Sequence, residues 1–345
     1  MSPLLFYTLP ALGGYVMLSI FFLRRPRLLH TPLTPAFRAR LAAHRGGSGE
    51  LLENTMEAME NSMAQRADLL ELDCQLTRDG VVVVSHDENL SRQSGLNRNI
   101  GSLNFEVGLA TTLHSHPLIP RVLCLLVTPS LLFPGASPVQ GGARDLLLTR
   151  PLCPWVRPAH GSPGGCIPEV PTDTYECGDQ REERGTHSEA SLVRRFDRNK
   201  ITIWASEKSS IMRKCKAANP EMPVSFTIGR TVWMLLLYYL GLLPFISISE
   251  KFFLCFLPTI INRTYFPFSS PGMNKLAAVF SKWVIMRKSL IRHLEERGVQ
   301  VVFWCLNEES DFEVALSLGA TGVMTDYPTA LRQYLDQHQP AALAS

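Results

Sequence analysis

Five side chains suited to phosphate-ester chemistry lie close together in the sequence. His44 and His86 can exchange protons near neutral pH. Glu71 and Asp73 are two residues apart in an apolar stretch, so a strand would put both carboxylates on one face. Two adjacent carboxylates are stable together when a cation neutralises them, and Mg²⁺ and Ca²⁺ are hard cations that take oxygen ligands. Arg45 stays charged and offers a planar fork of donors that fits a phosphate.

Short apolar runs beside these residues predict the strands that position them. Strands are predicted at 41–45, 69–76 and 81–86. A helix is expected from about residue 53 to 67, with Asn54 or Thr55 as its cap. His44 and His86 would then both lie at the carboxyl ends of neighbouring strands, beside the carboxylate pair.

The second half of the chain shows the same alternation of strand and helix. Further strands are predicted at 201–205, 223–228, 300–306 and 322–325. Helices are predicted near 192–196, from about 206 to 218, over 273–297 with Gly298 as the stop, and over 310–318. This alternation is typical of a parallel α/β barrel, and 345 residues suffice for one barrel of about 250 residues with appendages.

The segment 107–190 has a different composition from the rest of the chain. It holds eleven of the 24 prolines and nine of the 23 glycines. Such a stretch cannot form long helices or central strands. We therefore expect a disordered segment between a first barrel part, 41–106, and a second, 191–335, with a tail at 336–345.

The amino terminus predicts a membrane anchor. Residues 3–23 carry no charge and are long enough to cross a bilayer. Arg24, Arg25 and Arg27 follow at once and open a basic linker, 24–40. The positive-inside rule then places the body of the protein in the cytosol.

A second apolar block lies within the second barrel part. Residues 232–249 are free of charge, Glu250-Lys251 interrupts, and 252–261 is apolar again. Hydropathy alone favours a span, but a span would separate two parts of one barrel. A membrane-associated insertion over 232–261 is therefore expected, either a hairpin dipping into one leaflet or an apolar lip over the active site.

Charge and cysteine content exclude other classes. A net charge of +3 is too small to indicate nucleic acid as a partner. The eight cysteines are scattered without a C-x-x-C pair. Reduced thiols in a cytosolic domain explain this better than a zinc cluster or a disulfide framework.

The order and spacing of three motifs resemble the glycerophosphodiester phosphodiesterase family, which has a TIM-barrel fold. The motifs are His44-Arg45-Gly46, Glu71-Leu72-Asp73 and Ser85-His86-Asp87. The likeness covers about residues 40–106 and 191–335, and is strongest to the mammalian membrane-anchored branch of lysophospholipases D. It implies acid and base roles for His44 and His86, a phosphate contact at Arg45, and Mg²⁺ or Ca²⁺ on Glu71 and Asp73.

The resemblance also implies a substrate and a location. Trp304, Asn307 and the Thr325-Asp326 pair look like family positions that line the substrate end of the barrel. The expected reaction converts a lysophospholipid to lysophosphatidic acid and its head-group alcohol, at the endoplasmic reticulum or perinuclear membrane, in contact with membrane lipids. A soluble glycerophosphodiester is the alternative substrate.

One family feature is absent from the sequence. The family carries a Glu-x-Lys strand whose glutamate is a third metal ligand, and no Glu-x-Lys occurs between 106 and 200. Glu169 is poorly placed to replace it, because Pro168 and Pro171 flank it. We therefore expect a barrel with one strand replaced, and a catalytically impaired membrane protein is the third hypothesis.

Overall fold

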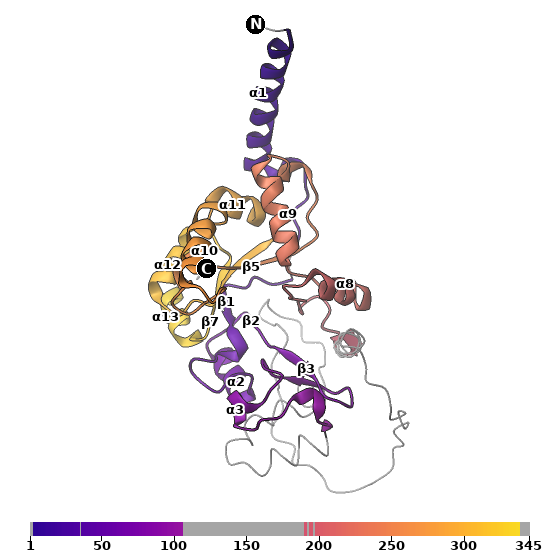
Figure 1. Cartoon of the computed structure of the whole chain (residues 1–345), viewed down its shortest axis with the longest axis vertical. Helices are drawn as coiled ribbons and strands as arrows, with labels where there is room; N and C mark the ends of the chain where they lie inside the picture. The colour runs from indigo at the N-terminus through magenta and orange to yellow at the C-terminus, as the bar shows by residue number, and fades with distance from the viewer. Residues whose placement is uncertain (1–2, 35, 106–189, 192, 196, 339–345) are drawn as a thin grey trace, which may run out of the picture.

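The computed structural model describes residues 3–34, 36–105, 190–191, 193–195 and 197–338. It shows a body of parallel strands and surrounding helices from which one long helix projects (Figure 1). Of the segment 107–190 that is predicted to be disordered, residues 107–189 lie outside this description, and so does the replaced strand. The labelled α-helices are α1 (Pro3–Arg24), α2 (Met56–Ala64), α3 (Ser91–Ser94), α8 (Ser209–Ala218), α9 (Ile228–Tyr239), α10 (Pro271–Val284), α11 (Lys288–Glu296), α12 (Glu309–Ser317) and α13 (Pro328–His338).

The main sheet is parallel and has the order β2-β1-β7-β6-β5. Its strands are β1 (Leu41–Ala43), β2 (Leu69–Leu70), β5 (Phe252–Phe256), β6 (Gln300–Trp304) and β7 (Gly322–Thr325). Single parallel bridges continue the sheet from Phe252 to Ser225 and from Val224 to Trp204. This confirms the predicted α/β barrel. Its described strands follow one another from the bridge at Trp204, through the bridge at Ser225, to β5, β6, β7, β1 and β2.

Alternate residues along the strands face two different layers. Ala42, Val302 and Met324 belong to one buried cluster, together with Phe37 and Phe252. Their strand neighbours pack on the other side, against the helices. Those neighbours are Leu41, Ala43, Val301, Phe303 and Val323. The period of two thus separates a filled barrel interior from the layer beneath the helices.

The predicted strand 69–76 is broken into two. β2 ends at Leu70, and β3 (Cys74–Leu76) pairs antiparallel with β4 (Val82–Val84) in a separate two-stranded sheet. Residues 81–86 therefore belong to an inserted hairpin and form no barrel strand. The prediction that His86 lies at the carboxyl end of a neighbouring barrel strand is wrong for this reason.

Two other predictions need correction. The helix expected over 273–297 is two helices, α10 and α11, separated at 285–287, although Gly298 does follow the second helix with a φ of +81°. In the apolar block, Phe252–Phe256 is the buried strand β5, so only the part before it can leave the sheet.

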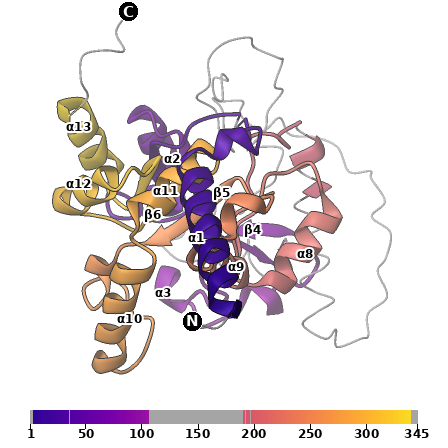
Figure 2. The ribbon, with the colours of Figure 1, turned by 90° about the horizontal axis from the view of Figure 1, so that it is seen from above.

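The first helix, α1, sits at the amino-terminal ends of the strands. Leu23 O accepts a hydrogen bond from His293 of α11, and Leu33 N donates to Arg297 O, just before β6 begins. Seen from above, α1 stands over the body, with α8 and α12 on opposite sides of it (Figure 2). The apolar segment after α9 also contacts α1 and not the carboxyl ends of the strands. An apolar lip over the active site is therefore not what this segment forms.

Candidate active site

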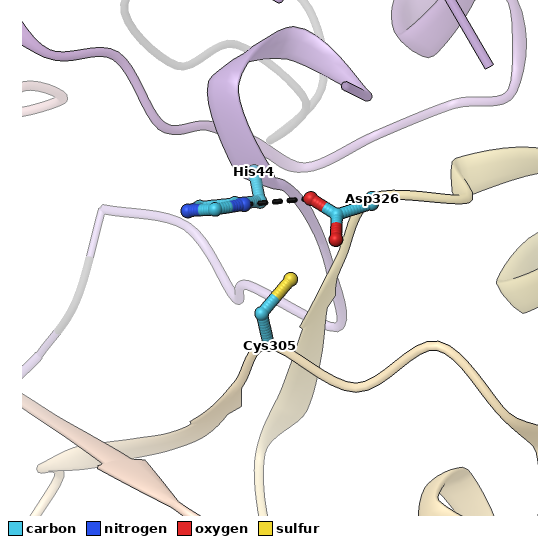
Figure 3. A group of neighbouring side chains, drawn as sticks. All are labelled: His44, Cys305 and Asp326. Carbon is cyan, nitrogen blue, oxygen red and sulfur yellow. Dashed lines mark hydrogen bonds and ion pairs between the residues drawn. The ribbon is translucent and has the colours of Figure 1, made fainter. Parts of the chain in front are cut away.

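His44 follows β1 directly and is held by a carboxylate from the other end of the chain. Its Nδ1 lies 2.7 Å from Oδ1 of Asp326, which follows β7, the neighbour of β1 (Figure 3). Its Nε2 lies 4.0 Å from Oε2 of Glu71. Burial lowers the pKa of His44, but the hydrogen bond to Asp326 and the charge of Glu71 outweigh burial and raise it above 6.5. The imidazole therefore keeps a proton to higher pH than an unperturbed histidine would.

Asp326 is kept ionised by three donors. Burial works against its charge, but hydrogen bonds from His44, Ser48 and Asn307 hold the pKa of Asp326 below its usual range. Ser48 Oγ lies 2.5 Å from Oδ1 and Asn307 Nδ2 lies 2.7 Å from Oδ2. Asp326 therefore fixes the orientation of the imidazole and directs Nε2 towards Glu71.

Cys305 completes a group that has the composition of a metal site. One ligand atom from each of His44, Cys305 and Asp326 lies within 4.8 Å of the others (Figure 3). Burial and the charge of Asp326 raise the pKa of the Cys305 thiol, which opposes the thiolate that a metal needs. Both Asp326 oxygens already accept hydrogen bonds. This group is better suited to orient His44 than to hold an ion.

Glu71 and Asp73 fit the divalent metal that the residue types predict. Burial, and then the charge of Asp73, raise the pKa of Glu71. Among the residues that the structure describes, Oδ2 of Asp73 is buried and has no hydrogen-bond partner. Two carboxylates that repel each other, one with an unsatisfied buried oxygen, are stabilised by a cation. A third carboxylate from the Glu-x-Lys motif is absent from the sequence.

Arg45 connects this pair to the protein around it. Its backbone N donates to Glu71 Oε2 at 2.9 Å, and its Nε lies 3.5 Å from Asp73 Oδ2. Both carboxylates therefore face the turn after β1, although residues 71–73 lie between β2 and β3 and not within one strand as predicted. Arg45 itself has a φ of +50°, and Gly46 and Gly47 also have positive φ, so the chain turns tightly here and presents the Arg45 amide to Glu71.

Glu53 is the centre of a second charge cluster. It accepts from Arg45 Nη1 at 3.2 Å and from Arg92 Nη2 at 2.6 Å. Burial would raise its pKa, but hydrogen bonds from Arg92 and Gln93 and the charge of Arg45 lower the pKa of Glu53 to about 2. Carboxylates therefore position Arg45 from two sides. Its Nη1 already donates to Glu53, which leaves fewer guanidinium donors for a phosphate.

His86 lies at the edge of this network. Its Nδ1 is 2.6 Å from Oδ1 of Asp87, and Asp87 also accepts from Arg92, which pairs with Glu53. Ser85 N donates to Asp73 O, so the backbone before His86 adjoins the carboxylate pair. Of the four predicted acid–base and metal residues, the structure brings His44, Glu71 and Asp73 together around Arg45. The imidazole of His86 is connected to them through Asp87, Arg92 and Glu53.

The two predicted substrate-lining residues have different surroundings. Trp304 ends β6 and packs edge-on against Tyr265, with ring centroids 5.3 Å apart. Asn307 donates to Asp326 Oδ2 and accepts from Asp326 N at 3.0 Å. Its amide therefore supports Asp326, while Trp304 forms part of an aromatic wall at the strand ends.

Several residues of the site had no assigned role in the sequence: Ser48, Glu53, Arg92, Gln93 and Cys305. Glu53 and Arg92 come from the loop before α2 and from α3, and only the fold brings them to Arg45. For Cys305, the sequence offered one indication of a place in the site, which is its position at the carboxyl end of a predicted strand. Asp326 has a similar position relative to its own strand.

Comparison with known proteins agrees with this geometry. The sequence model of the glycerophosphoryl diester phosphodiesterase family matches residues 44–109 and 169–330, well over half of the chain. This chain belongs to that family. The match extends into 169–190, so the part that departs from the family is shorter than the composition predicts. Enzymes of this family are phosphodiesterases and generally depend on a divalent metal.

Two curated relatives and one solved structure illustrate the likeness. "Lysophospholipase D GDPD3" of Homo sapiens is 65% identical over 345 residues, which is 100% of each chain. "Lysophospholipase D GDPD1" of Rattus norvegicus is 37% identical over 96% of this chain and 97% of its own. A putative glycerophosphoryl diester phosphodiesterase from Silicibacter pomeroyi DSS-3 superposes with a TM-score of 0.52 at 17% identity, covering 92% of this chain and 97% of its own. The structural match supports the barrel fold.

Proposed function

We propose that this chain is a lysophospholipase D, which hydrolyses the bond between phosphate and head-group alcohol in a lysophospholipid and leaves lysophosphatidic acid. The observation that carries the proposal is the His44 imidazole, held by Asp326 and facing the Glu71–Asp73 pair. The two curated lysophospholipases D, similar over almost their whole length, support the choice of substrate.

Each residue has a role that its surroundings support. A divalent ion on Glu71 and Asp73, Mg²⁺ or Ca²⁺, would supply positive charge to the non-bridging phosphate oxygens. His44 presents Nε2 on the same side and carries or accepts the proton of the reaction. Arg45 contacts the phosphate with the donors that Glu53 leaves available. His86 is the second acid–base group. It does not contact His44 directly, so the two imidazoles would act on the same bound substrate.

The membrane setting is part of the proposal. α1 is long and apolar enough to cross a bilayer, and only 6% of its most apolar window is buried in the protein. Arg24 ends the helix and Arg25 and Arg27 follow it, which favours a cytosolic body. We place the enzyme on the endoplasmic reticulum or perinuclear membrane. Residues 24–40 then lie beside the anionic lipid surface.

The test is a comparison of two substrates with the purified full chain. Choline release is measured from lysophosphatidylcholine and from glycerophosphocholine under the same metal concentration. The proposal predicts a higher kcat/KM for the lipid. Faster turnover of the soluble diester would make the chain a glycerophosphodiesterase instead.

The missing Glu-x-Lys motif defines a third outcome. If neither substrate is turned over at saturating Mg²⁺ or Ca²⁺, two carboxylates do not suffice and the chain is a catalytically impaired member of the family. Circular dichroism on the same sample shows whether the barrel is folded, which separates a lost ligand from a lost fold.

A further inference from the structure

The charge-free segment after Arg230 returns to its starting point. Residues 231–249 carry no charged side chain, and the flanking Arg230 and Glu250 pair with each other. Arg230 Nε donates to Glu250 Oε1 at 2.8 Å, Nη2 donates to Oε2 at 3.2 Å, and Glu250 is buried. A transmembrane span would separate the two charges by the roughly 30 Å of the hydrocarbon core. The segment therefore leaves the body and comes back on the same side.

The far end of this segment is fitted against α1. Tyr15 Oη donates to Leu240 O, and Ser19 Oγ donates to Gly241 O at 2.8 Å. Gly241 has a φ of +74°, and a Cβ there would lie 2.6 Å from Ser19 Oγ. Both the positive φ and the close approach of the Ser19 and Tyr15 side chains therefore favour glycine at this position.

These contacts fix the depth of the segment relative to α1. Tyr15 lies nine residues before Arg24, which is roughly 13 Å along a helix. Half of the hydrocarbon core is about 15 Å thick. If Arg24 lies at the interface, Leu240 and Gly241 lie within one leaflet. Their carbonyls are paired with α1, as backbone in lipid requires.

The side chains at this turn suit a lipid environment. The apolar residues Leu240, Leu242, Phe245 and Ile246 are between 37% and 52% exposed. In the carboxyl-terminal part of this turn, His30 Nε2 lies 2.8 Å from Pro244 O, and Arg297 Nη1 donates to Ile246 O at 2.8 Å. Basic side chains at this level indicate where the chain returns to the head groups.

We propose that Tyr239–Ile246 form a re-entrant membrane hairpin that inserts beside α1 into the same leaflet. This inference rests on the proposal that α1 spans the membrane. The hairpin and α1 together hold the barrel with the amino-terminal ends of its strands towards the bilayer. His44 and Asp326 follow the carboxyl ends of β1 and β7, so the active site faces away from that bilayer.

This orientation has a consequence for the substrate. A lipid cannot slide from the anchoring leaflet into a site at the opposite end of the barrel. A lipid with one acyl chain binds membranes only reversibly and can arrive through water, whereas a lipid with two chains stays in the bilayer. The orientation thus favours lysophospholipids over diacyl lipids.

Cysteine accessibility tests the hairpin in the full chain. Leu240→Cys and Ser317→Cys are reconstituted separately in phosphatidylcholine nanodiscs, which leave both membrane faces open, and treated with a maleimide carrying polyethylene glycol. Both positions are exposed in the protein itself, so only lipid can distinguish them. The measured quantity is the rate at which the introduced cysteine is labelled, after subtraction of the labelling that the native cysteines show in the unmodified chain. We expect this rate to be at least tenfold lower for Leu240→Cys than for Ser317→Cys.

The outcomes separate the hairpin from the anchor. A chain that does not elute with the discs would overturn the anchor and the hairpin together. Disc-bound Leu240→Cys that reacts as fast as Ser317→Cys would overturn the hairpin alone. In cells, a hairpin leaves the glycosylation sequons at Asn89 and Asn262 on the same side of the membrane. Sugar on exactly one of them would also overturn the hairpin. Sugar on neither agrees with the hairpin and with a cytosolic body.

Discussion

The substitution Asp326→Asn tests how the site controls its proton. It preserves the shape of the side chain but removes the charge that faces His44 Nδ1 at 2.7 Å. A hydrogen bond to a charged partner contributes about 1.5–3 kcal/mol, and a neutral one roughly half of that. The difference, about 0.7–1.5 kcal/mol in favour of the neutral imidazole, corresponds to roughly half a pKa unit to one unit.

The sign of the shift follows from the charge. Asp326 raises the pKa of His44, because it stabilises the imidazolium. Its removal lowers that pKa, so the limb of the pH–rate profile set by His44 moves to lower pH. The limb is alkaline if His44 is the acid and acidic if His44 is the base. The direction of movement is the same in both cases.

The assay is the pH dependence of kcat/KM for choline release, with wild type and Asp326→Asn at one metal concentration. Asp79→Asn is the matched control, because Asp79 also accepts side-chain and backbone hydrogen bonds but contacts none of the site residues. We expect a shift of about half a unit to one unit for Asp326→Asn and none for the control. Profiles that superpose would refute the role of Asp326 and of the raised pKa.

Three further predictions follow from the same structure. Glu71→Gln should raise the Mg²⁺ or Ca²⁺ concentration for half-maximal activity at least tenfold, and chelation should abolish wild-type activity reversibly; unchanged metal dependence would contradict the ligand role. Gly322→Ala should lower the melting temperature by several degrees or prevent folding, because its Cβ would overlap the Ala39 carbonyl, whereas Gly272→Ala should not; equal melting of the two would contradict the close approach. Glu53→Gln should lower the melting temperature relative to Glu88→Gln, because it leaves Arg45 and Arg92 without their shared carboxylate; equal unfolding curves would contradict this.

The barrel was predictable because its strands are marked locally. Apolar runs such as Leu41–Ala43 and Gly322–Thr325 are short and lie next to polar residues that do chemistry. Parallel strands bring such residues to one end of a barrel, so the sequence alone places His44 and the carboxylate pair together.

The errors fall where local sequence carries no signal. Nothing between Leu70 and Cys74 marks the change from a parallel barrel strand to an antiparallel hairpin, and this change is what separates His86 from His44. The helix break at 285–287 contains neither glycine nor proline. Phe252–Phe256 is as apolar as a membrane segment, and only its pairing with β6 shows that it is core.

The hydrogen bond between His44 and Asp326 could not be predicted from the sequence for a different reason. His44 and Asp326 are 282 residues apart, and closure of the sheet between β1 and β7 brings them into contact. The role of Asn307 was likewise hidden, because an amide that supports Asp326 and one that lines a pocket have the same sequence context.

The most direct test of the account is the product formed from lysophosphatidylcholine by the purified chain with Mg²⁺ or Ca²⁺. Mass spectrometry should detect lysophosphatidic acid and free choline in equal amounts, and His44→Ala should form neither while remaining folded. Full activity in His44→Ala, or glycerophosphocholine and a fatty acid as the products, would contradict it.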